Sequence, residues 1–147
     1  MTELELKHWL NRAFYADKKS VALTQLAEQY RERARGLTQA LGSTGVSHGN
    51  NNSAEQALIR LADMEERCAA QVRELSAVSD EIASAISLLH DNDLEAVLIH
   101  RYLLFHTVEQ TADEMHYSER TIKRKQTHAI SKLVTLCPCF APSDVVD

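Results

Sequence analysis

The sequence predicts an all-α protein with a long antiparallel helical hairpin followed by a C-terminal three-helix helix-turn-helix domain. Only four of the 147 residues are Gly and two are Pro, and no Pro precedes Pro138, which permits long uninterrupted helices. Apolar residues recur at spacings of three and four on both sides of one Gly- and Asn-rich stretch. Two shorter helical patterns near the C-terminus each follow a capping residue. We expect the hairpin over 1–90, the helix-turn-helix domain over 91–136 and a tail over 137–147.

The first helix of the hairpin is predicted from a seam that alternates by three and four residues, as in a coiled coil. Its members are Leu23, Leu26, Tyr30, Ala34, Leu37 and Leu41. An apolar stripe precedes the seam and consists of Trp9, Leu10, Ala13, Phe14 and Val21. Residues 42–53, GSTGVSHGNNNS, then hold three of the four glycines and no apolar pattern, so we expect a flexible hairpin loop there.

The second hairpin helix is expected to begin at a Ser53 cap and to run for about 37 residues, or roughly 55 Å at the rise of an α-helix. Its apolar seam is Leu58, Leu61, Met64, Cys68, Val72, Leu75, Val78, Ile82, Ile86 and Leu89. A hairpin of two helices leaves apolar surface uncovered. We therefore expect a homodimer or a higher homo-oligomer through the hairpin. The alternative is a monomer whose hairpin folds back onto its own C-terminal domain.

The C-terminal domain is predicted from three helical segments. The first, Leu94 to Phe105, is apolar nearly all round and could be capped by Asn92 or Asp93. The second begins at a Thr107 cap, with Gln110 at capping-box spacing. The third follows a Ser118 cap and has a buried stripe of Ile122, Ala129, Ile130 and Leu133.

The third helix also carries a basic face, which predicts binding to duplex DNA in the major groove. The net charge is −5, but residues 118–133 hold five bases and one acid, whereas residues 54–98 hold ten acids and three bases. The alternative is that this basic face is exposed to solvent and binds no partner. The candidate DNA-binding residues are Thr107, Ser118, Glu119, Arg120, Thr121, Lys123, Arg124, Lys125 and Lys132.

These residues have different expected roles. Arg can pair with guanine and Glu can accept from cytosine, so the first two turns of the helix should read the bases. Lys123, Lys125 and Lys132 are expected to meet phosphates. The backbone amides after Thr107 and Ser118 could also hold phosphates, because helix N-termini attract anions.

Other function classes find no support in the sequence. Gly-rich phosphate loops, serine-nucleophile elbows and paired catalytic carboxylates are all missing, so we expect neither an enzyme nor a cofactor. Cys137 and Cys139, with His128 upstream, are too few for a structural zinc site, and no metal is expected. No apolar run could span a membrane, and three cysteines without an export signal indicate a reducing cytoplasm.

The segment RYLLFHTVEQTADEMHYSERTIKRKQTHAISKL, residues 101–133, resembles the region-four helix-turn-helix of bacterial sigma factors. The whole chain is similar to small phage and prophage proteins that carry this module behind a helical hairpin. These proteins are related to late-transcription regulators of phages of Gram-positive bacteria. Further landmarks are residues 10–17 (LNRAFYAD), Arg101-Tyr102 and Tyr117-Ser118. The resemblance implies a regulator, most simply an activator, of phage gene transcription.

Region four of sigma factors also contacts RNA polymerase, which makes this enzyme a further candidate partner by resemblance. Three residues depart from the pattern of the family. Thr111 stands where an aliphatic residue is usual, His116 where Gly is common, and Gln126 where Leu often packs. Thr111 could hydrogen-bond to the preceding turn, and His116 could adopt the left-handed conformation.

Two other functions are compatible with this organisation. One is a phage DNA-packaging protein similar to a terminase small subunit, which also joins such a module to an oligomerising helical part. The other is a helical protein–protein adaptor with a degenerate helix-turn-helix. The acidic middle helix and the departures at Thr111 and Gln126 favour the adaptor.

Overall fold

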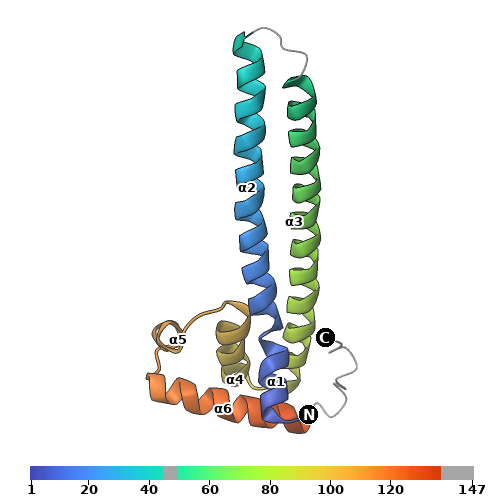
Figure 1. Cartoon of the computed structure of the whole chain (residues 1–147). Coiled ribbons are helices and arrows are strands. Elements are labelled where there is room, and N and C mark those ends of the chain that lie inside the picture. The colour runs from blue at the N-terminus through green and yellow to red at the C-terminus, as the bar shows by residue number, and fades with distance from the viewer. Residues whose placement is uncertain (45–49, 137–147) are drawn as a thin grey trace. The chain divides into compact units, whose positions relative to one another are not determined.

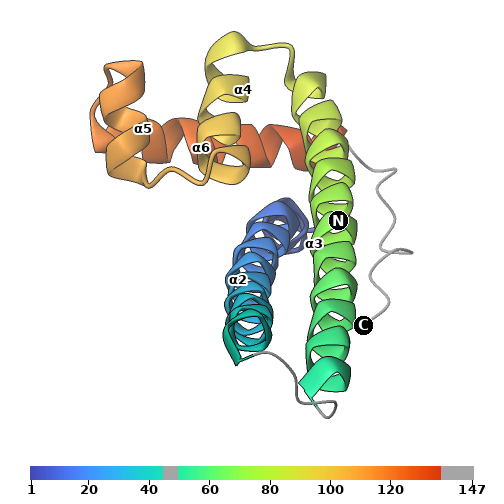
Figure 2. The ribbon, with the colours of Figure 1, turned by 90° about the horizontal axis from the view of Figure 1, so that it is seen from above.

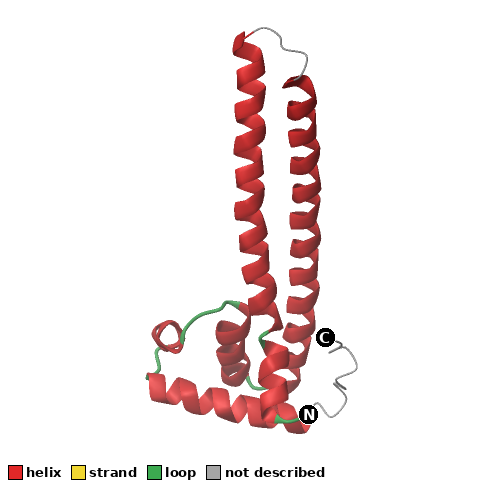
Figure 3. Cartoon of the chain, in the orientation of Figure 1, coloured by secondary structure: helices red, strands yellow, loops and turns green. Residues whose placement is uncertain are grey.

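The computed structural model describes residues 1–44 and 50–136, and the elements in this part of the chain are all helical (Figure 3). The α-helices are α1 (Glu3–Leu10), α2 (Arg12–Thr44), α3 (Asn50–Ile86), α4 (Asn92–Leu98), α5 (Val108–Met115) and α6 (Glu119–Leu136). A 3₁₀ turn, η1 (Ser87–Leu89), and a π-helical turn, η2 (Ile99–Leu103), flank α4. The predicted all-α class is confirmed. None of the described helices is long and apolar enough to cross a membrane.

The chain forms two compact units whose boundaries differ from the predicted division at residue 90. The hairpin unit consists of the described residues of 16–75, and the helix-turn-helix unit consists of residues 1–15 and 76–136. Helices α2 and α3 each continue from one unit into the other. The tail over 137–147, with Cys137 and Cys139, lies outside the described residues.

The hairpin unit pairs α2 and α3 in antiparallel directions, as predicted (Figure 1). Near one end the Gln71 side chain donates to the carbonyl of Ala16 at 3.1 Å, and farther along Arg31 pairs with Glu65 at 3.3 Å. Ala27 and Ala34 form the buried line of α2, seven residues apart, as expected for a coiled-coil position.

Some members of the predicted seams are buried as expected and others are not. The buried members are Ala34, Met64, Ile82, Ile86 and Leu89. Leu26 and Leu37 are each 37% exposed and border the Ala27–Ala34 line, while Leu58 and Val72 on α3 are about half exposed. Small Ala side chains let two helix backbones approach closely, and the larger side chains then lie at the margin of the contact. The buried positions of α3 include Ala54, Met64 and the polar Gln71.

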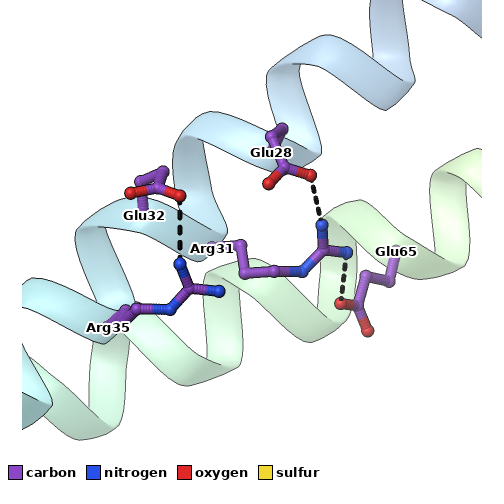
Figure 4. A network of polar contacts seen from close by, with 5 residues as sticks. All are labelled: Glu28, Arg31, Glu32, Arg35 and Glu65. Atoms are coloured by element: carbon purple, nitrogen blue, oxygen red, sulfur yellow. Dashed lines mark hydrogen bonds and ion pairs between the residues drawn. The ribbon is translucent and has the colours of Figure 1, made fainter.

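Ion pairs cover part of the surface of the hairpin unit (Figure 4). Arg31 lies between Glu28 on its own helix and Glu65 on α3, and Arg35 pairs with Glu32. These side chains are 40–62% exposed, so each pair contributes little to stability.

The helices extend into the loop predicted over 42–53. Residues 42–44 belong to α2 and residues 50–53 to α3, so Ser53 is an internal helical residue and not a cap. Gly, Asn and Ser each disfavour the helical conformation by about 1 kcal/mol or less relative to Ala. Extension of an existing helix by a few residues can offset a cost of that size. Residues 45–49 lie outside the described part of the chain.

The helix-turn-helix unit is built around α6. Helices α1, α4 and α5 and the turn η1 all contact α6 (Figures 1 and 2). The stripe predicted for α6 is confirmed, because Ile122, Ala129, Ile130 and Leu133 are buried. Leu6 and Leu10 of α1 are also buried here, so α1 belongs to this unit and not to the predicted hairpin.

Helix α4 begins at Asn92, two residues before the predicted start at Leu94. Asp91, not Asn92 or Asp93, is its N-cap, and its carboxylate accepts from the backbone N–H groups of Asp93 and Leu94. Val97, Leu98 and Tyr102 are buried. Phe105 is half-buried and packs edge-to-face on Phe14, with 5.7 Å between ring centroids.

Candidate nucleic-acid interface

Two side-chain caps begin the helices of the helix-turn-helix. The Thr107 hydroxyl accepts from the N–H of Gln110 at 3.1 Å, and the Gln110 side chain accepts from the N–H of Thr107 at 2.9 Å. The Ser118 hydroxyl accepts from the N–H of Thr121 at 3.2 Å and also bonds the Thr121 hydroxyl. Both predicted caps are confirmed, and they fix the start of α5 and of α6.

The turn between α5 and α6 depends on one left-handed residue. His116 has φ 60° and ψ 40°, and the N–H of Tyr117 returns to the carbonyl of Ala112 at 3.0 Å. This is the usual way to end a helix, with His in place of the more favourable Gly. Fully buried Thr111 donates its hydroxyl to the Thr107 carbonyl at 2.9 Å. The expected accommodation of both departures is confirmed.

The N-terminal half of α6 exposes a basic surface, which we call the basic ridge and define as Arg120, Lys123 and Arg124. All three side chains are exposed, and none forms an ion pair with another described residue. They share one side of the helix, opposite the buried Ile122 and Ala129. Glu119 is exposed beside them at the first turn, and Thr121 is half-buried.

Lys125 does not share this ridge. It follows Arg120 by five residues, about 140° around the helix. Its ammonium lies 3.2 Å from the Asp93 carboxylate of α4 and 5.1 Å from the centroid of the Tyr117 ring. The Tyr117 hydroxyl donates to the same Asp93 oxygen at 2.7 Å. We call Asp93, Tyr117 and Lys125 the carboxylate clamp.

The carboxylate clamp perturbs two of its groups. The hydrogen bond from Tyr117, and then that from Lys125, lowers the pKa of Asp93 below its usual value. The hydrogen bond to Asp93, and then burial, raises the pKa of Tyr117 above its usual value. The clamp therefore ties α4, the turn and α6 together, and the charge of Lys125 is matched within the protein.

Lys132, which is also predicted to contact phosphate, bonds a group within the protein. Its ammonium donates to the carbonyl of Leu89 at 3.0 Å, at the end of η1, and its side chain is half-buried. It follows Lys125 by seven residues, so both lie at the margin between the buried stripe and solvent. The expectation of one basic face with five cations is wrong for these two lysines.

Sequence reasoning missed a polar network that holds α6 against η2. Arg101 donates to the Gln126 side chain at 3.0 Å and to the His106 carbonyl at 2.6 Å. The Gln126 amide donates to the Tyr102 hydroxyl at 3.2 Å. Burial raises the pKa of Tyr102, and the bond from Gln126 opposes that rise. Gln126 is thus a bridging residue, although its position alone suggested a packing defect.

The arrangement can present cations and free helix-start amides to an anionic surface, while the residues behind them are fixed by side-chain bonds.

Comparisons with protein-family models, with curated proteins and with solved structures found no match to this chain.

Proposed function

We propose that this chain is a sequence-specific duplex-DNA-binding transcription regulator of phage or prophage genes, acting in the cytoplasm as an activator. The observation that carries the proposal is the basic ridge at the start of α6, exposed and without an acidic partner among the described residues. On a protein whose net charge is −5, the ridge concentrates positive charge at one place, and such a local group of cations attracts an anionic partner.

In this proposal the first two turns of α6 enter the major groove. Arg120 and Arg124 read guanine, Glu119 accepts from cytosine, and each correct pair contributes about 1–3 kcal/mol of discrimination. Lys123 and the backbone amides after Thr107 and Ser118 contact phosphates, which set the register on the duplex. Lys125 and Lys132 hold α6 in place and do not contact DNA.

The proposal includes self-association through the hairpin unit. Val21, Leu58, Ile59 and Val72 are each at least half exposed there, so their apolar surface is available for burial against a second copy. Two copies related by a twofold axis would present two α6 helices to a DNA site made of two half-sites. RNA polymerase is a further proposed partner, by resemblance to sigma factors alone.

The experiment is selection of bound fragments from a phage or host genome by the full-length protein. The wild type is compared with a variant that carries Arg120→Ala, Lys123→Ala and Arg124→Ala. The proposal predicts enrichment of promoter-proximal fragments that the triple variant loses. Recovery of the same unenriched background by both proteins would overturn it, and would favour the protein–protein adaptor.

A fragment set confined to one packaging-type locus, bound by a ring-shaped oligomer, would instead support a terminase small-subunit-like role. Mass measurement of the unbound protein in solution distinguishes a ring from a dimer.

A further inference from the structure

Two histidine side chains meet outside the proposed DNA-binding surface. The Nδ1 atoms of His100 and His106 are 3.0 Å apart, and their ring centroids are 5.2 Å apart. Both side chains are half-buried. The sequence separation of six fits neither the i,i+3 nor the i,i+4 spacing of ligands on one helix, so it gives no metal signal.

The backbone around the pair is fixed by several independent constraints. Leu104 N–H bonds the Ile99 carbonyl in a π-helical turn, and His106 N–H bonds the His100 carbonyl, both at 2.9 Å. Phe105, which lies between Leu104 and His106, has φ 58°, a strained conformation for a non-Gly residue that persists only where the surroundings impose it. Arg101 fixes the loop through its 2.6 Å bond to the His106 carbonyl. The backbone that carries the two rings is thus fixed before any ligand arrives.

Two facing imidazole nitrogens can interact in two ways. In the metal-free protein one ring donates its Nδ1–H to the other. When both Nδ1 atoms are unprotonated, each can donate its lone pair to one cation placed between them. Two imidazoles on one tetrahedral metal have metal–nitrogen distances of about 2.0–2.1 Å, which places the nitrogens about 3.3 Å apart. A small opening of the observed 3.0 Å pair reaches that separation.

We propose that His100 and His106 bind one divalent transition-metal ion, of the Zn²⁺, Ni²⁺, Co²⁺ or Cu²⁺ class, through their Nδ1 atoms. These metals favour imidazole ligands, whereas Mg²⁺ and Ca²⁺ favour oxygen. No third His, Cys, Asp or Glu of the described chain joins the pair, so water completes the coordination of the ion. The half exposure of both rings leaves room for that water.

The bound ion would cross-link the π-helical turn η2 to the residue just before Thr107, the N-cap of α5. Because it binds the folded form preferentially, it would stabilise the helix-turn-helix unit by mass action. This site goes beyond the proposed DNA binding and does not depend on it.

The test is calorimetric titration of the full-length protein with ZnCl₂, in a background that carries Cys137→Ser and Cys139→Ser to remove competing thiols. His100→Ala and His106→Ala should each weaken zinc binding by at least about tenfold, the range that loss of even an outer-shell partner produces. The matched control is His128→Ala, an exposed histidine on α6, which should leave the affinity unchanged. MgCl₂ should give no binding heat.

A second measurement avoids the chance that a variant unfolds. In the same background with both histidines intact, zinc should shift or broaden the NMR ring signals of His100 and His106 before those of the other five histidines. No zinc binding in that protein, first effects at other histidines, or unchanged affinity in both variants would each overturn the proposal.

Discussion

The two units of this protein show the same apolar spacing in sequence but bury it differently. In the helix-turn-helix unit, large side chains such as Leu10, Ile122 and Leu133 are completely buried. In the hairpin unit, the buried line of α2 is made of Ala27 and Ala34, and Leu neighbours lie at its margin. Periodicity therefore predicts that a helix packs, while the size of the residue at each position decides how much apolar surface it removes from water.

The two units also differ in how exposed and how specific their charged and amide contacts are. Ion pairs of the hairpin unit, such as Arg31 with Glu65, are exposed and replaceable. In the helix-turn-helix unit, Lys125, Gln126 and Lys132 each bond a specific partner on another element. The helix-turn-helix unit is held by specific bonds between its elements, whereas the hairpin unit leaves more of its large apolar side chains exposed.

The largest expected effect contrasts two leucines. Leu133→Ala removes a fully buried side chain and should lower the free energy of unfolding by about 3–4 kcal/mol. Leu37→Ala, at a side chain that is 37% exposed, should cost less than about 1.5 kcal/mol. Urea unfolding followed by circular dichroism measures both. Equal losses would contradict the contrast between the units.

Substitutions at Lys123 and Lys125 distinguish a lysine that is proposed to contact DNA from one that is proposed only to position α6. Lys123→Ala should weaken binding to all sequences and reduce the slope of log affinity against log salt by about 1. Lys125→Ala should lower thermal stability, because it breaks the carboxylate clamp, and should leave that slope unchanged. Fluorescence anisotropy across salt concentrations measures the slopes. A smaller slope in Lys125→Ala would mean that this lysine also meets phosphate.

Replacement of half-buried Gln126 and buried Gln71 by Leu is expected to change the free energy of unfolding less than Leu133→Ala does. Gln126→Leu leaves the groups of Arg101 and Tyr102 without their partner and should cost about 1 kcal/mol of unfolding free energy. Gln71→Leu loses one bond to the Ala16 carbonyl and places an apolar group at a buried helix contact, so it should be close to neutral. Thermal unfolding of the two variants compares them. A stabilising Gln126→Leu would show that the polar network is dispensable.

The smallest expected effect is the pH dependence of the carboxylate clamp. Because the folded pKa of Asp93 is lowered below that of the unfolded chain, its contribution to stability is fully present above the unfolded pKa and is lost as pH falls through the folded pKa. The melting temperature of the wild type should exceed that of Asp93→Asn at neutral pH, and the difference should shrink under acid. A difference that stays constant down to the acid limit would rule out the clamp as its cause.

Local features of this protein were predictable from sequence. The Thr107 and Ser118 caps depend on residues within three positions, and the left-handed His116 follows from a turn that must end a helix. The buried stripe of α6 also follows from its own spacing.

Features that depend on which elements meet were not predictable. The sequence gives no sign that α1 packs with α6, that Lys132 reaches the Leu89 carbonyl or that His100 faces His106. A cation at the margin of a helix face can point to solvent or to a neighbouring element. Only the position of that neighbour, such as Asp93 beside Lys125, decides between the two.

The central claim is that the basic ridge on α6 binds DNA because of where it lies, not because of its charge alone. The most direct measurement is the affinity for a selected fragment across salt, for the wild type and two triple variants of equal charge change. One carries Arg120→Ala, Lys123→Ala and Arg124→Ala. The other carries Arg60→Ala, Arg67→Ala and Arg73→Ala, at three exposed arginines of α3.

The α6 variant should lose specific binding and its steep salt dependence, while the α3 variant should match the wild type. Equal losses in both variants would contradict the claim and would reduce the interaction to general electrostatic attraction.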